Sequence, residues 1–345
     1  LGIVVEVAGQ RMQKEFESVI ERQIHHLING ADGIEHIAQR DITWIRINKA
    51  AFERGLRIRH LGDIIYRNLH NDFGAIVDKI QVTLYTERVM VGELIEKARA
   101  AYRERDTRMA GLTDDAVDTF YSCTLCQSFA PNHVCIVSPE RAGLCGAYTW
   151  LDCRTAYELN PKGSNQPVPK GRCIDQIKGE WEGVNSFVYE HSNRSVERFT
   201  LYSLMDAPTT TCGCCECVMI IVPEANGVMI VSRDDYSMTP SGMTFTTLMG
   251  VVGGGHQNPG MIGHSKFYIT SRKFISADGG VKRVVWLSRN VKEGFAEELK
   301  EACEREGVPD LMEKIADGTT ATTLDELISF LEGKGHPALG MGPLI

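Results

Sequence analysis

Residues 120–147 read FYSCTLCQSFAPNHVCIVSPERAGLCGA, which places Cys123, Cys126, Cys135 and Cys145 on one short stretch of chain. The spacing is C-x2-C-x8-C-x9-C. Proline, asparagine and glycine between the later cysteines predict a loop that carries these thiols. Four thiolates gathered by a loop are a typical ligand set for a metal ion or an iron–sulfur cluster.

Three interpretations of this spacing stay open. Structural zinc sites often use two close cysteine pairs, whereas here only Cys123 and Cys126 form one. A [4Fe–4S] cluster is larger and tolerates more dispersed ligands, although neither ferredoxin spacing is matched. The third interpretation is a set of buried free thiols without a metal.

A second cysteine stretch, TCGCCECV, occupies residues 211–218. The thiolates of Cys212 and Cys214, with the backbone nitrogens of Gly213 and Cys214, can chelate one metal in a square plane, which Ni(II) or Cu(II) prefers. Gly213 brings no side chain to a close approach of the backbone to the metal. The alternative is a buried turn with inert thiols. Cys215 and Cys217 follow, and the sequence indicates no role for them.

Composition narrows the class of protein. The formal net charge of the 345 residues is −8, which disfavours nucleic-acid binding. No apolar run is long enough to cross a bilayer, and the opening LGIVVEVAGQ lacks the basic start and apolar core of a signal peptide. We therefore expect no membrane contact and a cytoplasmic location. Because the chain has no initial methionine, we also expect a fragment that lacks its N-terminal part.

The distribution of cysteine points to metal or redox chemistry. Ten of the 11 cysteines lie between Cys123 and Cys217. Disulfide scaffolds are typical of small secreted chains, which this chain does not resemble.

Hydrophobic periodicity predicts an α/β (α+β) fold with two mixed α/β domains, residues 1–112 and 113–345, separated at the polar stretch 106–116. The cysteine stretches place the metal cluster in the second domain. Helices are predicted at 12–29, 92–109, 179–191, 291–307 and 323–333, and strands at 42–47, 76–85, 218–222, 228–232, 267–270 and 281–287. Residues 161–171 and 253–260 are predicted loops.

Local signals mark two further features. Thr323 and Glu326 predict a capping box, and Gly333 and Pro337 are expected to stop the helix that follows it. The arginine-rich stretch RGLRIRH, residues 54–60, is interpreted either as a solvated strand edge or as a seat for a phosphorylated ligand.

Taken together, the two cysteine stretches resemble the acetyl-CoA synthase subunit of the carbon monoxide dehydrogenase/acetyl-CoA synthase complex. The family motif FYSCxLCQSFAPNHVCIVxPERxGLCGA runs from Phe120 to Ala147, and MTPSGMTF (238–245), KFISADGG (273–280) and GKGHPAL (333–339) also fit. The resemblance covers the whole chain but not the family's large N-terminal domain. The chain is therefore expected to be either a truncated bacterial subunit or a naturally short form.

The resemblance implies a site, a nickel–nickel–[4Fe–4S] centre called the A-cluster. Cys123, Cys126, Cys135 and Cys145 would ligate the [4Fe–4S] cluster, and Cys126 would also bridge it to a proximal nickel. Cys212 and Cys214 would bridge this nickel to a distal one, completed by the nitrogens of Gly213 and Cys214. Copper or zinc could replace nickel at the proximal position. Phe129 would overhang the proximal nickel, unless it only packs in the core, and His133 would be a supporting residue.

The resemblance also implies an activity. The chain would be a CO-methylating acetyl-CoA synthase, an acyltransferase of the anaerobic Wood–Ljungdahl pathway, which joins CO, a methyl group from a corrinoid iron–sulfur protein and CoA. A carbon monoxide dehydrogenase subunit would be a partner, although the domain that docks it is absent here. Candidate contacts for CoA are Trp44, Arg54, Arg57 and Arg59. The alternative function is a non-catalytic Fe–S electron carrier or a zinc-stabilised scaffold, with metal at the first cysteine group only.

Overall fold

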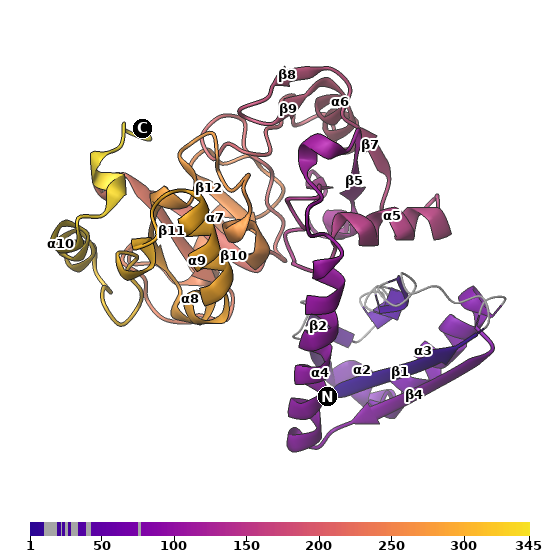
Figure 1. Cartoon of the computed structure of the whole chain (residues 1–345). Coiled ribbons are helices and arrows are strands. Elements are labelled where there is room, and N and C mark those ends of the chain that lie inside the picture. The colour runs from indigo at the N-terminus through magenta and orange to yellow at the C-terminus, as the bar shows by residue number, and fades with distance from the viewer. Residues whose placement is uncertain (10–18, 22, 25–26, 29–33, 39–42, 75–76) are drawn as a thin grey trace. The chain divides into compact units, whose positions relative to one another are not determined.

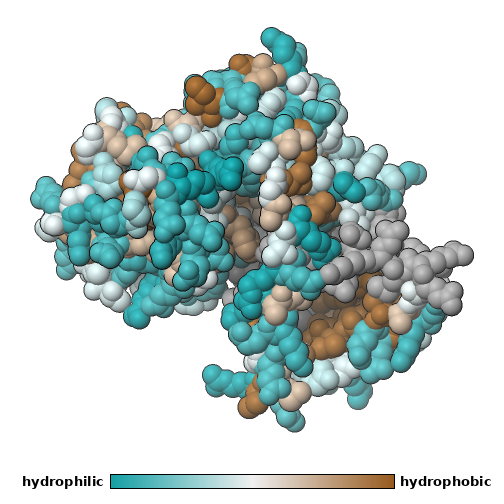
Figure 2. Space-filling view, in the orientation of Figure 1, coloured by the Kyte–Doolittle hydropathy of each residue, from teal (hydrophilic) through white to brown (hydrophobic). Residues whose placement is uncertain are grey.

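The computed structural model describes residues 1–9, 19–21, 23–24, 27–28, 34–38, 43–74 and 77–345. The chain divides into two units, Leu1–Gly111 and Leu112–Ile345. Within the described part, no helix has both the length and the apolar character needed to cross a membrane. The face shown in Figure 2 is mostly hydrophilic.

The first unit combines two antiparallel strand pairs with helices. Strand β1 (Gly2–Ala8) pairs antiparallel with β4 (Lys79–Tyr85), and β2 (Ile34–Ala38) pairs antiparallel with β3 (Thr43–Ile47). The helices whose bounds the structure describes are α2 (Lys49–Glu53), α3 (Arg59–Phe73) and α4 (Arg88–Thr107), and the described residues 19–21, 23–24 and 27–28 are also helical. Helix α3 packs against β4 and buries Leu61, Ile65, Leu69 and Phe73, a helical spacing that gives it one apolar face.

Most predictions for this unit are confirmed where the structure describes it. The strands predicted at 42–47 and 76–85 correspond to β3 and β4, and the helix predicted at 92–109 lies within α4 apart from its last two residues. The helix predicted at 12–29 falls largely outside the described residues. The strand-edge interpretation of residues 54–60 is wrong, because they form the turn after α2 and the start of α3.

The second unit begins with the cysteine-bearing sheet. Strand β5 (Thr119–Cys123) lies between β6 (Cys135–Val137) and β7 (Pro167–Pro169), and both neighbours are antiparallel to it. The expectation that 161–171 is all loop is therefore wrong for β7. Because β7 is an edge strand, its two prolines interrupt no ladder beyond it. Nearby elements are η1 (Asp114–Ala116), η2 (Leu125–Ser128), α5 (Trp150–Leu159), β8 (Cys173–Asp175), β9 (Glu180–Trp181) and α6 (Glu182–His191).

A larger sheet forms the core of this unit, in the order β12-β10-β11-β13. Strands β10 (Cys217–Val222) and β11 (Gly227–Ser232) form an antiparallel hairpin, β12 (Met261–His264) pairs antiparallel with β10, and β13 (Val284–Leu287) pairs parallel with β11. Helix α7 (Phe245–Val252) packs against β10 and β12, and α10 (Leu324–Lys334) packs against β13 (Figure 1). The buried strands read as nearly continuous apolar runs, which is why the sequence predicts β10 and β11 well.

Two strand predictions in the second unit need correction. Residues 267–270 lie in a 3-10 helix, η4 (Lys266–Thr270), and residues 281–283 in another, η5 (Gly280–Arg283), before β13 begins. In η4 the Tyr268 hydroxyl lies 3.1 Å from the carbonyls of both Leu201 and Lys273, which share its single proton. This long-range anchoring of a buried ring selects the tight turn over an extended strand.

The helix predictions also need two corrections. The predicted helix 291–307 is divided into α8 (Arg289–Gly294) and α9 (Ala296–Arg305) at Phe295, whose ring packs edge-to-face with Phe267. The capping box of Thr323 and Glu326 is confirmed. Gly333 does not end the helix, however; Gly335 does, with φ of 61° in the left-handed region that glycine tolerates. The remaining short helices are η3 (Pro223–Ala225), η6 (Leu311–Glu313) and η7 (Pro337–Gly340).

Candidate metal centre

The first cysteine segment is built on the β5–β6 pair. Cys123 and Cys135 are directly opposite each other across the two strands, and both are buried. Cys126 lies in η2 between them, and its carbonyl accepts from the N–H groups of Phe129 and Ala130 at 3.2 and 2.9 Å. Cys145 follows β6 in a turn closed by Gly146 N–H donating to the Gly143 carbonyl at 2.8 Å. Antiparallel pairing thus places Cys123 opposite Cys135, although the two are distant in sequence.

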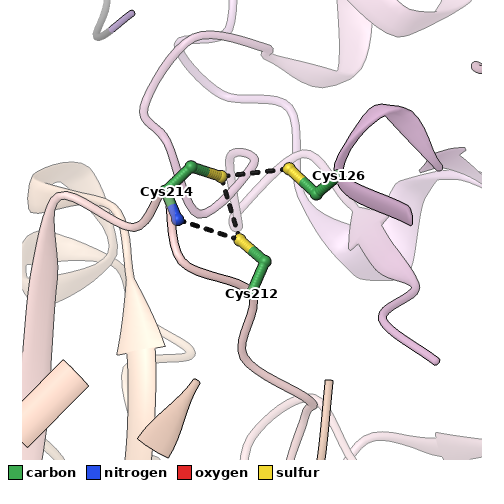
Figure 3. A group of neighbouring side chains, drawn as sticks. All are labelled: Cys126, Cys212 and Cys214. Atoms are coloured by element: carbon green, nitrogen blue, oxygen red, sulfur yellow. Dashed lines mark hydrogen bonds between the residues drawn. The ribbon is translucent and has the colours of Figure 1, made fainter. Parts of the chain in front are cut away.

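Cys126 meets the second cysteine stretch directly (Figure 3). The sulfurs of Cys126, Cys212 and Cys214 all lie within 4.8 Å of one another. Cys214 Sγ is 3.1 Å from Cys126 Sγ and 2.9 Å from Cys212 Sγ, and the Cys214 N–H donates to Cys212 Sγ at 3.3 Å. Two sulfurs and one backbone nitrogen of the Cys-Gly-Cys turn therefore already converge, with a third sulfur from the first segment beside them.

Backbone hydrogen bonds hold the second stretch against the first. The Glu216 N–H donates to the Leu144 carbonyl at 2.9 Å, and the Gly255 N–H donates to the Thr211 carbonyl at 2.8 Å. Gly255 has φ of 85°, and a Cβ there would lie 2.8 Å from the backbone nitrogen of His133. The glycine-rich loop 253–260 therefore supports the turn that carries Cys212.

Burial and crowding govern protonation of the thiols. Burial raises the pKa of Cys123, and neighbouring Cys135 and Cys145 raise it further. Burial likewise raises the pKa of Cys135 to about 12. Hydrogen bonds from Cys126 and then Cys214 hold the pKa of Cys212 well below its ordinary value. The pKa of Cys126 is raised chiefly by its hydrogen bond to Cys212, and the pKa of Cys214 is raised chiefly by its hydrogen bond with Cys126. One thiolate is thus stabilised, and further deprotonation requires a cation.

The donor set fits a thiophilic metal centre. Fe–S clusters, zinc and nickel-type ions bind thiolate ligands, and metal binding releases the protons of the cysteine thiols. His133 is 1% exposed, its Nδ1 lies 2.9 Å from the Thr210 hydroxyl, and its Nε2 has no hydrogen-bond partner among the described residues. His133 also lowers the pKa of Cys212. Among the described residues, His133 therefore acts on the Cys212 thiolate, which is the role of a supporting residue.

Phe129 and Gly213 face each other at the exposed side of this centre. Phe129 ends η2 and is 60% exposed, so packing in the core does not account for it. A Cβ on Gly213 would lie 3.7 Å from Phe129 Cε2, an ordinary contact. The protein itself therefore leaves room at Gly213, and a requirement for glycine would have to come from a bound metal.

Cys215 and Cys217 do not join the group of Cys126, Cys212 and Cys214. Cys215 is buried and lies 3.2 Å from the Met249 sulfur in α7. Gly263 on β12 makes space for it, since a Cβ there would lie 2.7 Å from Cys215 Sγ. Cys217 begins β10 within the apolar core. Both thiols are packing residues in this fold.

The candidates for CoA contact lie in the first unit. Arg54 lines a cavity of about 320 Å³ with Leu56 and His60. Arg57 donates to the carbonyls of Phe52 and Leu56 at 2.7 and 2.8 Å, so its guanidinium is used locally. Arg59 begins α3, and Trp44 lies in β3, where its side chain is outside the described part.

Two arginines that the sequence did not single out support the cysteines. Arg141, within the quoted motif, is 2% exposed and donates to the Leu201 carbonyl and the Thr209 hydroxyl. Arg233 follows β11 and donates to the carbonyls of Gly213 and Cys215. Arg141 was visible only as part of the family motif, and Arg233 had no local signal.

Two family models and several known proteins are similar in sequence to this chain. The family described as the C-terminal part of the ACS/CODH beta subunit matches residues 102–345, and "CO dehydrogenase/acetyl-CoA synthase complex beta subunit" matches residues 1–91. The carbon monoxide dehydrogenase/acetyl-CoA synthase subunit alpha of Moorella thermoacetica is 53% identical over 100% of this chain and 48% of its own length. The chain thus spans about half of that relative.

Two further similarities were found. The acetyl-CoA decarbonylase/synthase complex subunit beta of Methanopyrus kandleri is 42% identical over 98% of this chain and 70% of its own length. A solved structure of the C-terminal domain of an acetyl-coenzyme A synthase alpha subunit is 49% identical, covers 39% of this chain and 100% of that chain, and gives a TM-score of 0.37.

Proposed function

We propose, because this chain belongs to the family of the carbon monoxide dehydrogenase/acetyl-CoA synthase beta subunit, that it synthesises acetyl-CoA at a nickel–nickel–[4Fe–4S] centre. In this proposal it is an acyltransferase that joins CO, a methyl group and CoA. The methyl donor is a corrinoid iron–sulfur protein, and a carbon monoxide dehydrogenase subunit is a further partner.

The proposal rests on one observation, the contact of Cys126 with Cys212 and Cys214. Cys126 belongs to the first cysteine segment, yet its sulfur is 3.1 Å from that of Cys214. A thiolate has several lone pairs and can be shared between two metals. An electron carrier would need only the first segment, whereas a bridged centre needs this convergence.

Each residue has a defined task in the proposal. Cys123, Cys126, Cys135 and Cys145 would hold the [4Fe–4S] cluster; Cys126, Cys212 and Cys214 would hold the proximal metal; and Cys212, Gly213 and Cys214 would hold the distal nickel. When bound, this centre supplies the carbon–carbon and carbon–sulfur bond-forming chemistry. Cys126 and Cys214 are half-buried, which leaves small ligands a route to the shared sulfurs. The exposed ring of Phe129 would limit the size of what enters.

The test is metal analysis combined with CO/acetyl-CoA exchange on protein loaded anaerobically with iron, sulfide and nickel. We expect four iron and two nickel ions per chain together with exchange, as the proposed centre requires. Cys126→Ser should abolish exchange and lower the nickel content, whereas Cys173→Ser, at an exposed thiol outside the centre, should preserve both. Full metal occupancy without exchange would contradict the catalytic proposal, and iron without nickel would favour an electron carrier.

A further inference from the structure

The Arg233 side chain donates hydrogen bonds to the backbone at the Cys-Gly-Cys turn. Its Nε donates to the Cys215 carbonyl at 2.9 Å, and its Nη2 donates to the Gly213 carbonyl at 2.5 Å. The guanidinium therefore spans two peptide oxygens that flank Cys214. A planar fork with fixed donor directions is suited to this kind of two-point contact.

The position of Arg233 is fixed by three further features. It directly follows β11, and its own N–H donates to the Glu216 carbonyl at 2.8 Å. Its guanidinium carbon lies 5.1 Å from the centre of the Phe245 ring, at the start of α7. Among the described residues no carboxylate forms an ion pair with it. The guanidinium of Arg233 is thus held against the backbone of the turn, and in the described part of the chain no acidic side chain neutralises its charge.

The peptide unit that Arg233 contacts is also the one that faces the thiols. Gly213 O and Cys214 N belong to the same amide, and the Cys214 N–H points to Cys212 Sγ at 3.3 Å (Figure 3). When a divalent metal binds through two thiolates and two backbone nitrogens, each thiol and each amide releases its proton to solvent. The deprotonated ligands of the turn then carry more negative charge than the divalent ion neutralises. Amide resonance moves part of that charge from Cys214 N onto Gly213 O.

We propose that Arg233 is a positioning residue that holds the Cys-Gly-Cys turn in its metal-chelating form and offsets the charge that a bound metal leaves on the Gly213–Cys214 peptide. This inference rests on the proposed function, because it assumes that a metal binds to the backbone of the turn. It adds a cation to the centre that none of the cysteine spacings indicates. The guanidinium stabilises the metal-bound turn more than the metal-free turn, since the charge on the carbonyl oxygen increases on binding.

The experiment compares four anaerobically loaded proteins: the parent, Arg233→Gln, Arg233→Lys and Arg305→Gln. Arg305 is the matched control, because it donates to one backbone carbonyl, that of Thr270 at 2.9 Å. Nickel affinity is measured by competition with a chelator of known affinity, iron per chain by metal analysis, and nickel bound to nitrogen and sulfur in a plane by X-ray absorption. Arg233→Gln should lose about tenfold to a hundredfold in nickel affinity, the effect of one charge-assisted hydrogen bond. Arg233→Lys, which keeps the charge but not the fork, should lose less.

The outcomes separate the inference from the proposed function. Nickel loss in Arg233→Gln with unchanged iron, partial rescue by lysine and no change in Arg305→Gln would support the inference. Unchanged nickel affinity and absorption in Arg233→Gln, with planar nickel present in the parent, would overturn the inference alone. Equal loss of iron and nickel would also overturn it, because Arg233 would then be a support for the whole unit. No planar nickel in the parent would overturn both.

Discussion

Replacing Arg141 with methionine should loosen the contact between the two cysteine segments. Its Nη1 donates to the Leu201 carbonyl at 2.6 Å, its Nη2 donates to the Thr209 hydroxyl at 2.7 Å, and the guanidinium lies 4.6 Å from the centre of the Tyr268 ring. Two charge-assisted hydrogen bonds correspond to about 3–6 kcal/mol, and removing a buried charge offsets part of that. We expect a net loss of about 3 kcal/mol in the free energy of unfolding.

Urea unfolding of the metal-loaded protein, with iron and nickel analysis, measures this effect. Arg283→Met is the control, because Arg283 is also buried and donates to three backbone carbonyls, those of Asp278, Asn226 and Gly342. Both variants should be destabilised, but only Arg141→Met should lose nickel. A destabilisation below about 1 kcal/mol, or equal nickel loss in both variants, would refute the reasoning.

Three other changes give separate tests. Gly213→Ala should leave the free energy of unfolding within about 1 kcal/mol, whereas Gly213→Val should lose nickel and keep iron; nickel retained in the valine variant would contradict a backbone-bound metal. Asp114→Ala should cost about 3 kcal/mol in urea unfolding, more than Asp114→Asn, because buried Asp114 accepts from Tyr202, Ser138 and the Glu140 N–H. Equal costs would show that the carboxyl oxygens do not act as the anchor. Burial lowers the pKa of His264 to about 4, so the unfolded chain binds more protons and stability falls as the pH drops below the ordinary value of 6.5. From about pH 7.5 to about pH 5.5 this histidine should cost about 1.3 kcal/mol, and His264→Gln should remove that share of the pH dependence in urea titrations.

Regular elements with a strong local signal could be predicted from the sequence. The apolar runs of β10 and β11 are buried on both faces, and the Thr323 capping box is formed by residues three apart. Errors arose where distant contacts overrode the local pattern. Phe295 interrupts a helical pattern through its contact with Phe267, and Tyr268 is held in a 3-10 helix by contacts that include the distant Leu201 carbonyl.

The cysteines that converge at the candidate site could be named from the sequence, but the residues that support them could not. Cys212, Gly213 and Cys214 are adjacent in the chain, so the sequence alone predicts that they could chelate one metal. The loop 253–260 reaches the turn through its backbone, and the Arg233 side chain donates to backbone carbonyls of the turn. A contact with a backbone group leaves no sequence pattern in the turn. Only the fold shows that Gly255 approaches His133 and Thr211.

Residues 212–217 contain four cysteines, but only Cys212 and Cys214 belong to the candidate metal site. Cys215 occupies a space that Gly263 on β12 leaves open, and Cys217 fills the core at the start of β10. What distinguishes Cys212 and Cys214 from these two is not their number but their contact with Cys126, a residue of the other segment. In the proposed centre, a chain with the same four cysteines but without that contact would offer thiols to one metal and no sulfur shared with the first segment. The bridge, rather than the crowding of thiols, is therefore the feature on which the proposed chemistry depends.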